Sequence, residues 1–318
     1  MFLKLLNKIC ALNDFILSPV TFLIDKLSWA DWIKDALTDS FNILPFLLFI
    51  FILIELFEFY FMDRLHKVVE RSKKFGPVIG GFAALIPQCG FSVIASSLYV
   101  RRLISRGTLL AVYLATSDEA IPVLMSEPDK AYLIVPILGV KFFIGITAGY
   151  LVDFFVKSSP VRTEPHQEHE EILEHEHGCC SHSITRQSNI FLHPVLHTLH
   201  VFAFILLITL ALNYIVFMMG GEEQLGHYFL TSTIWQPVIA AFIGLIPNCA
   251  VSVAITLLYM KGLFSFASVV SGLLSGAGLG LLVLFRKNGI KDTATTVGLL
   301  LGISIFSGIA IQILQNIF

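Results

Sequence analysis

This sequence has unusually few charged residues. Only 14% of its 318 residues are Asp, Glu, Lys or Arg, while 56% are hydrophobic and the mean hydropathy is +0.80. Charged residues make up about a quarter of an average globular domain, so this chain has too few to cover a soluble surface. The composition therefore excludes a soluble domain and predicts an all-α polytopic membrane protein.

Three further absences narrow the functional classes. The 21 basic and 23 acidic residues give a net charge of -2, which leaves no basic excess for binding nucleic acid. The cysteines number five, an odd count that includes the adjacent Cys179 and Cys180, and this does not suit a disulfide framework. No Walker motif is present, so transport driven by ATP hydrolysis within this chain is not expected.

Long apolar runs take the place of charge. Each has about 20 residues or more, enough for a helix to cross roughly 30 Å of hydrocarbon. The runs cover residues 41–62, 77–100, 107–125, 131–156, 192–217, 230–259, 262–285 and 293–318. Residues 1–40 are predicted to form membrane or interfacial helices, because polar residues interrupt the apolar stretches there.

Two of the runs contain the same unusual motif. The stretch "ALIPQCGFSVIASSLYV" at 84–100 is echoed by "GLIPNCAVSVAITLLYM" at 244–260, a shift of 160 residues. Each places a proline, an amide and a cysteine in an apolar segment, and proline interrupts a helix by removing a hydrogen-bond donor. We therefore interpret 41–156 and 191–318 as two homologous halves, joined by a polar linker at 157–190.

Lysine and arginine placement predicts how the halves are oriented, because short cytoplasmic loops collect positive charge. Basic residues flank the segment 77–100 on both sides, so it should enter and leave the membrane from the cytoplasm. The other loops place 230–259 as a hairpin from the outside, with Lys261 as the exception. The sequence thus predicts two inverted-topology repeats, each with three spanning helices and a re-entrant broken-helix hairpin, about ten helical segments in all.

The hairpin tips supply the first candidate site residues. Irregular backbone deep in a membrane is tolerated only where it is buried in protein or lines a cavity. We therefore predict that one shared ion or substrate site contains Gln88, Cys89 and Ser92 from the first hairpin and Asn248, Cys249 and Ser252 from the second. The alternative is a pair of kinked spanning helices whose cysteines only pack.

A second group of candidates lies in "ATSDEA", in the middle of the run 107–125. An acid inside the membrane is costly and marks a functional site by default. We therefore predict that substrate or a coupling ion is bound by Thr116, Ser117, Asp118 and Glu119. Lys141 lies at a depth from which its long side chain can reach Asp118, and Glu55 approaches the same region. Lys141 and Glu55 are therefore the predicted coupling residues. A static salt bridge between Asp118 and Lys141 is the alternative.

The linker is rich in metal ligands. Among the glutamates of "EPHQEHEEILEHEHGCCSHS" lie His166, His169, His175, His177, Cys179, Cys180 and His182. Imidazole and thiolate suit zinc, cadmium, cobalt, nickel or copper, and carboxylates also accept manganese or ferrous iron. We predict a flexible metal-binding linker, with His193, His197 and His200 continuing toward the membrane on one helical face. A solvated acidic linker and interfacial histidines are the simpler alternatives.

These motifs resemble a known family of ten-span heavy-metal exporters, whose members carry labels such as arsenic efflux or manganese transport. The resemblance lies in "GGFAALIPQCGFSV" and its echo "IGLIPNCAVSV", in "ATSDEA" and in the His-rich loop, and it covers 41–318. It implies metal efflux. The second half has no acid at the position of Asp118, so two equivalent metal sites are not expected.

From the residues and the resemblance we expect a secondary active transporter, not an enzyme. It should export a divalent transition metal ion by alternating access around a midplane site, coupled to a proton or sodium gradient. The metal is substrate, with zinc, manganese, iron, cobalt, nickel and cadmium all open, and no tightly bound cofactor is expected. The expected partners are the metal ion and the lipid bilayer of a bacterial inner membrane, with a homodimer left open.

Two other functions match parts of the sequence. An ion-coupled transporter could bind an anion or small organic acid at the hairpin helix N-termini, with Lys141 as the counter-charge. An intramembrane enzyme is disfavoured, because the second half has no acid that could complete a catalytic pair with Asp118.

Overall fold

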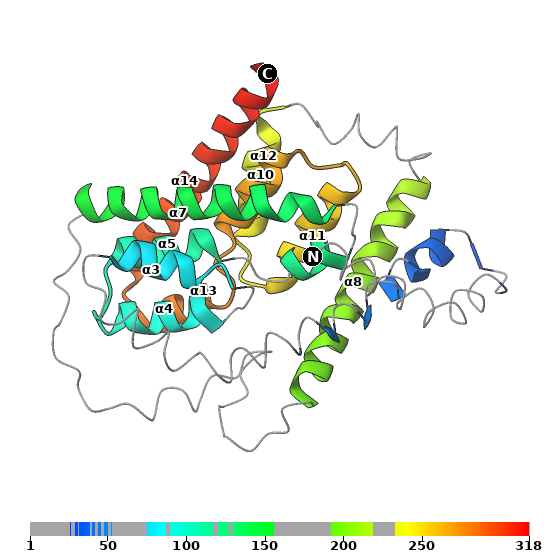
Figure 1. Ribbon diagram of the computed structural model, residues 1–318, viewed down its shortest axis with the longest axis horizontal. Helices are drawn as coiled ribbons and strands as arrows, with labels where there is room; N and C mark the ends of the chain where they lie inside the picture. The colour runs from blue at the N-terminus through cyan, green and yellow to red at the C-terminus, as the bar shows by residue number, and fades with distance from the viewer. Residues whose placement is uncertain are drawn as a thin grey trace.

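The computed structural model describes residues 26, 29–30, 32–38, 40–41, 44–45, 48–49, 52, 75–86, 90–116, 120–126, 130–155, 192–218 and 233–317. All regular structure in these ranges is helical (Figure 1). The first half contributes α3 (Gly76–Ala83), α4 (Gly90–Val100), α5 (Arg106–Ala115), α6 (Ala120–Ser126), a 3-10 turn (Ala131–Leu133) and α7 (Ile134–Phe155). The second contributes α8 (Leu192–Met218), α10 (Trp235–Gly244), α11 (Cys249–Met260), α12 (Phe266–Ser275), α13 (Gly280–Lys287) and α14 (Ile290–Ile317).

Interrupted helices recur in both halves. In the second half α10 ends at Gly244 and α11 begins at Cys249, with Pro247 between them, as the sequence predicts. The apolar runs 107–125 and 262–285, expected to be single spans, are each divided, into α5 and α6 and into α12 and α13. The backbone between α12 and α13 turns at Gly278, whose φ of 53° is a conformation that glycine adopts without strain.

The turns that follow α4 and α11 have the same geometry. Arg102 and Gly262 occupy equivalent left-handed positions, with φ of 63° and 73°, a common way to end a helix. Three residues later, Ser105 and Ser265 cap α5 and α12, each side chain accepting a hydrogen bond from a backbone amide in the first turn. The backbone therefore repeats at the spacing at which the sequence repeats.

Replacing Ser265 with alanine is expected to weaken one of these turns. Its Oγ accepts from the Ser268 amide at 3.2 Å and donates to Gln312 Oε1 at 2.8 Å. Loss of an N-cap hydroxyl costs about 1 kcal/mol, so thermal unfolding of the detergent-solubilised protein should show a fall of about 1 kcal/mol in stability. The matched control is Thr295→Ala on exposed surface of α14, whose hydroxyl bonds Lys291 O of its own helix. An equal loss in both variants would contradict the capping role.

Hydrogen bonds gather the helix ends at two separate places. At the first, Asp153 near the end of α7 accepts from Ser105 Oγ at 2.6 Å and from the Gly107 amide at 2.8 Å, and Arg106 pairs with Asp292 near the start of α14. At the second, Ser265 binds Gln312 near the end of α14. The turn that follows α4 and the turn that follows α11 therefore lie near opposite ends of α14.

The length of α14 matches a membrane. Asp292 and Gln312 are 20 residues apart on one continuous helix, which is roughly 30 Å at 1.5 Å per residue and close to the thickness of the hydrocarbon core. The α7 helix is similarly long and apolar, and Figure 1 shows it lying alongside α3 and α5. Both agree with the predicted spans 131–156 and 293–318.

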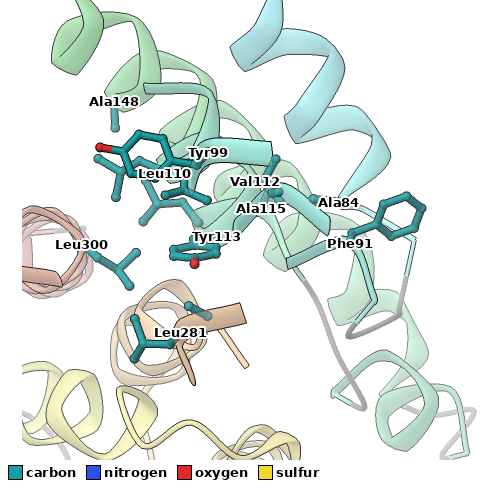
Figure 2. Packing of buried hydrophobic residues seen from close by; sticks show 14 of the residues in the cluster. Ala84, Phe91, Tyr99, Leu110, Val112, Tyr113, Ala115, Ala148, Leu281 and Leu300 are labelled. Atoms are coloured by element: carbon teal, nitrogen blue, oxygen red, sulfur yellow. The ribbon is translucent and has the colours of Figure 1, made fainter. Parts of the chain in front are cut away.

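The two halves are interleaved in the core. α13 of the second half packs against α4 of the first, and α6 of the first packs against α11 of the second. One apolar cluster accordingly joins α3, α4 and α5 to Leu281 and Leu300 (Figure 2). Another joins Leu124 of α6 and Ile137 of α7 to residues of α10, α11 and α12. Neither half therefore completes its own core.

Burial separates inner from outer helices. The most apolar stretch of the α5–α6 segment is 93% buried inside the protein, and that of the α12–α13 segment is 78% buried. The corresponding stretches of α7 and α14 are only 22% buried. The outer faces of α7 and α14 present large apolar side chains such as Phe143, Phe154 and Phe306. Exposed apolar surface of this extent suits lipid, so α5, α6, α12 and α13 form much of the protein interior and α7 and α14 face the bilayer.

Candidate functional site

Helix interruptions from both halves meet at one small cavity. Its volume is ≈ 10 Å³, about the room that one water molecule needs. The lining residues come from α7, from the end of α5, and from both interruptions of the second half: Thr116, Lys141, Gly244, Ile246, Asn248, Ser252, Ile255, Gly272, Leu273, Gly276 and Gly278. The cavity thus brings together four of the predicted site residues, namely Thr116, Lys141, Asn248 and Ser252.

Lys141 carries the only charge among the described residues that line the cavity. Its side chain is buried in the middle of α7, with 1% of its surface exposed. The ammonium donates to the carbonyl oxygen of Thr116, directly after α5, and to that of Leu273 in the last turn of α12 at 2.9 Å. The lysine predicted to act in coupling therefore reaches both halves of the chain.

The helix ends around the cavity supply polar groups. Thr116 adopts ψ of 128°, so the helix stops there and its carbonyl turns toward Lys141. Asn248 lies directly before α11, where its carbonyl accepts from the Val251 amide at 3.1 Å. Ser252 lies in the first turn of α11 and is partly buried. The negative ends of α5 and α12 and the positive end of α11 therefore face one space.

Small residues allow the backbones to approach at this place. A Cβ on Gly244 would overlap the carbonyl of Gly272 and the hydroxyl of Ser275. Small residues let helices pack closely. Gly276 and Gly278 also line the cavity, although neither was predicted as a site residue. The signal was available, because a shift of 160 places "SGAGLG" at 275–280 opposite "ATSDEA" at 115–120.

Ser92 lies elsewhere in the described structure. It is fully buried on α4 and is not among the residues that line this cavity. Its carbonyl accepts from Ser96 Oγ at 2.5 Å, and Ser96 Oγ also donates to Gly280 O at 2.8 Å. The surroundings of Ser92 are therefore the contact between α4 and α13.

Several candidates lie outside the described residues. These are Glu55, Gln88, Cys89, Ser117, Asp118, Glu119 and the linker residues His166, His169, His175, His177, Cys179, Cys180 and His182. Cys249 opens α11, but its side chain is not described. Their predicted roles stay predictions.

The histidines at the start of the second half lie on α8. His193, His197 and His200 fall within the helix Leu192–Met218, as the predicted helical face requires. Of the three side chains, that of His200 is described; it is exposed, and its Nδ1 lies 3.0 Å from Leu196 O. Within the described ranges no three His, Cys, Asp or Glu residues are close enough to hold a metal ion.

The described lining of the cavity offers carbonyl, amide and hydroxyl oxygens. Oxygen donors of this kind suit hard cations, whereas the softer transition metals favour imidazole and thiolate. In the sequence, Cys249 directly follows Asn248 of this lining, and Asp118 lies two residues after Thr116.

Comparison with known proteins gives one result. A family model described as "Putative, 10TM heavy-metal exporter" matches residues 29–213 and 197–317, which together cover most of the chain. No curated protein and no solved structure matches. The match confirms the resemblance that the sequence motifs indicated.

Proposed function

Because the chain belongs to this family of heavy-metal exporters, we propose that it is a secondary active transporter that carries a divalent transition metal ion out of the cytosol. Its multi-pass membrane nature follows from the family and from the four helices that are long and apolar enough to cross a bilayer among the described residues. The proposed location is a bacterial inner membrane.

The observation that carries the proposal is the cavity at the helix interruptions. Non-helical backbone inside a membrane protein is tolerated where it lines a site, and here three such places converge on polar atoms from both halves. Carbonyl oxygens at helix C-terminal ends attract cations. The cavity therefore supports passage of a cation near the middle of the protein.

The proposed mechanism is alternating access between two inverted repeats. The turns that follow α4 and α11 lie near opposite ends of α14, which is the arrangement expected if one repeat is turned over relative to the other. Rocking of one hairpin against the other would open the cavity to each side in turn. Asp118, Glu119, Cys89 and Cys249 are the proposed metal ligands beyond the described lining.

The linker and the driving force complete the proposal. The histidines and cysteines of 166–182 would collect metal on the cytoplasmic side and deliver it past His193, His197 and His200. A proton or sodium gradient would drive export, with Lys141 and Glu55 in the coupling. The specific metal, among manganese, zinc, cobalt, nickel, iron and cadmium, is left to experiment.

Metal accumulation tests the proposed function directly. Cells that express the protein should contain less of at least one of these six metals than cells that lack it, as measured by elemental analysis. Joint replacement Asn248→Leu and Ser252→Ala removes two polar side chains of the cavity. We expect export to fall roughly 10-fold or more, the scale on which loss of groups around a metal affects binding.

The matched control is Thr147→Ala on the exposed face of α7, where the hydroxyl bonds Phe143 O at 2.7 Å. This variant should export like the wild type at equal protein level. Equal contents of all six metals with and without the protein would count against metal export, and unchanged export by the cavity variant would move the pathway elsewhere.

A second candidate function has one observation in its favour. The N-terminal end of α11 opens on the cavity at Asn248, and such an end attracts anions. Against an anion, the Lys141 ammonium is already engaged by two carbonyls. Uptake of a radiolabelled organic acid or of chloride that depends on Lys141, without any change in metal content, would favour this alternative.

A further inference from the structure

The ammonium of Lys141 lies where two helix ends converge. Thr116 directly follows α5 and Leu273 lies in the last turn of α12, and the carbonyl oxygens of both accept from Lys141 Nζ. The C-terminal end of a helix carries roughly half a negative charge. Two such ends, one from each half of the chain, therefore share a single positive charge in the protein interior.

Such a place has the features of a site for a small monovalent cation. Carbonyls at the ends of interrupted helices coordinate alkali cations in membrane transporters. The adjoining cavity of ≈ 10 Å³ has room for about one water molecule or one bare ion. Of the described residues that line it, all but Lys141 are uncharged.

We propose that Lys141 is a tethered substitute for an alkali cation: its ammonium fills a cation site formed by the C-terminal carbonyls of α5 and α12. The protein therefore needs no free sodium or potassium at this point. Removal of the side chain leaves two negative helix ends facing each other, and a small cation from solution then takes the vacant place.

The other half of the chain shows that a lysine is not required to pack this helix. Gly149 of α7 and Gly308 of α14 are equivalent, because a Cβ on either would crowd against a proline of the first hairpin helix, Pro77 or Pro237. The same spacing of 159 residues pairs Lys141 with Leu300. Leu300 is fully buried and belongs to the apolar core with Tyr113 and Leu281 (Figure 2). The charge at Lys141 is thus a feature of one half alone.

The test is rescue of Lys141→Ala by small cations. Thermal unfolding of the purified full chain is followed in sodium, potassium, ethylammonium and tetramethylammonium chloride at equal ionic strength. In tetramethylammonium, which is too large for the site, the variant should unfold at lower temperature than the wild type. Sodium, potassium or ethylammonium should raise its Tm by roughly 3 to 6 °C, while the wild type should shift by less than about 1 °C.

Two further variants sharpen the test. Lys141→Met keeps the unbranched chain without the charge, so it should lose stability and show no cation response, because its side chain occupies the space. Leu300→Ala opens a hole at the equivalent apolar position, so it should lose stability without recovery in any salt.

Three results would overturn the proposal: no cation-dependent recovery of Lys141→Ala, equal recovery of Leu300→Ala, or a Lys141→Met variant as stable as the wild type. If Lys141→Ala does not accumulate, the comparison of Lys141→Met with the wild type decides. None of these measurements involves transport, so their failure would leave the proposed metal export standing.

Discussion

Replacing Gly244 with alanine is expected to prevent α10 from packing against α12. The added methyl group would overlap the backbone carbonyl of Gly272, which cannot move aside as a flexible side chain could. Overpacking of a tight core costs about 1–3 kcal/mol and sometimes more. Because the obstacle is backbone on a helix that is buried on all sides, we expect the upper end of this range. The yield of folded, monodisperse protein in detergent should fall severalfold.

Gly298→Ala is the matched control for this change. Gly298 lies on α14, where an added Cβ meets no described atom within 4 Å. Alanine also favours a helix over glycine by about 1 kcal/mol, so this variant should be as stable as the wild type or slightly more so. If both variants behave like the wild type in size-exclusion chromatography and thermal unfolding, that result would contradict the close contact between α10 and α12 at Gly244.

Breaking the ion pair between Arg106 and Asp292 should have the second large effect. The pair joins the start of α5 to the start of α14, and the two side chains are only 10% and 19% exposed. Tyr99 donates to Asp292 at 2.9 Å and Asn288 donates to it at 2.8 Å. Asp292→Ala would leave these donors and a buried guanidinium without their acceptor. Removing one partner of a buried pair costs about 3–5 kcal/mol, and partial exposure reduces this to about 2 kcal/mol.

A double-mutant cycle distinguishes the pair from the separate side chains. Arg106→Met with Asp292→Leu should lose less stability than the sum of the single changes, because neither charge is then left alone. Arg286→Ala, which removes an exposed cation at the end of α13, is the control and should change stability by less than about 0.5 kcal/mol. Additive losses in the cycle would show that the two charges do not stabilise each other.

The sequence predicted the fold through residues whose effect on the backbone is local. Pro247 lies in the middle of an apolar run, where a proline interrupts a helix, and the repeat at 84–100 and 244–260 extended that inference to the other half. The divided spans at α12 and α13 were missed, because glycines such as Gly276 and Gly278 permit a break without requiring it. Whether they form one depends on packing against the other half.

The candidate site was predicted in part for a similar reason. Asn248, Ser252, Thr116 and Lys141 were singled out because each is polar in an apolar segment, and the structure places all of them on one cavity. The partners of Lys141 could not be predicted, because the acceptors are backbone carbonyls of Thr116 and Leu273. Every residue has a backbone carbonyl, so residue type does not indicate which carbonyls accept from the lysine. Only the folded arrangement identifies these acceptors.

The interleaving of α6 with α11 bears on how the protein is made. α6 ends at Ser126 and its partner begins at Cys249, so the ribosome must add more than a hundred residues before that surface is covered. Until then the surface of α6 that α11 covers would be exposed to lipid. The first half therefore cannot complete its packing before the second half has been synthesised.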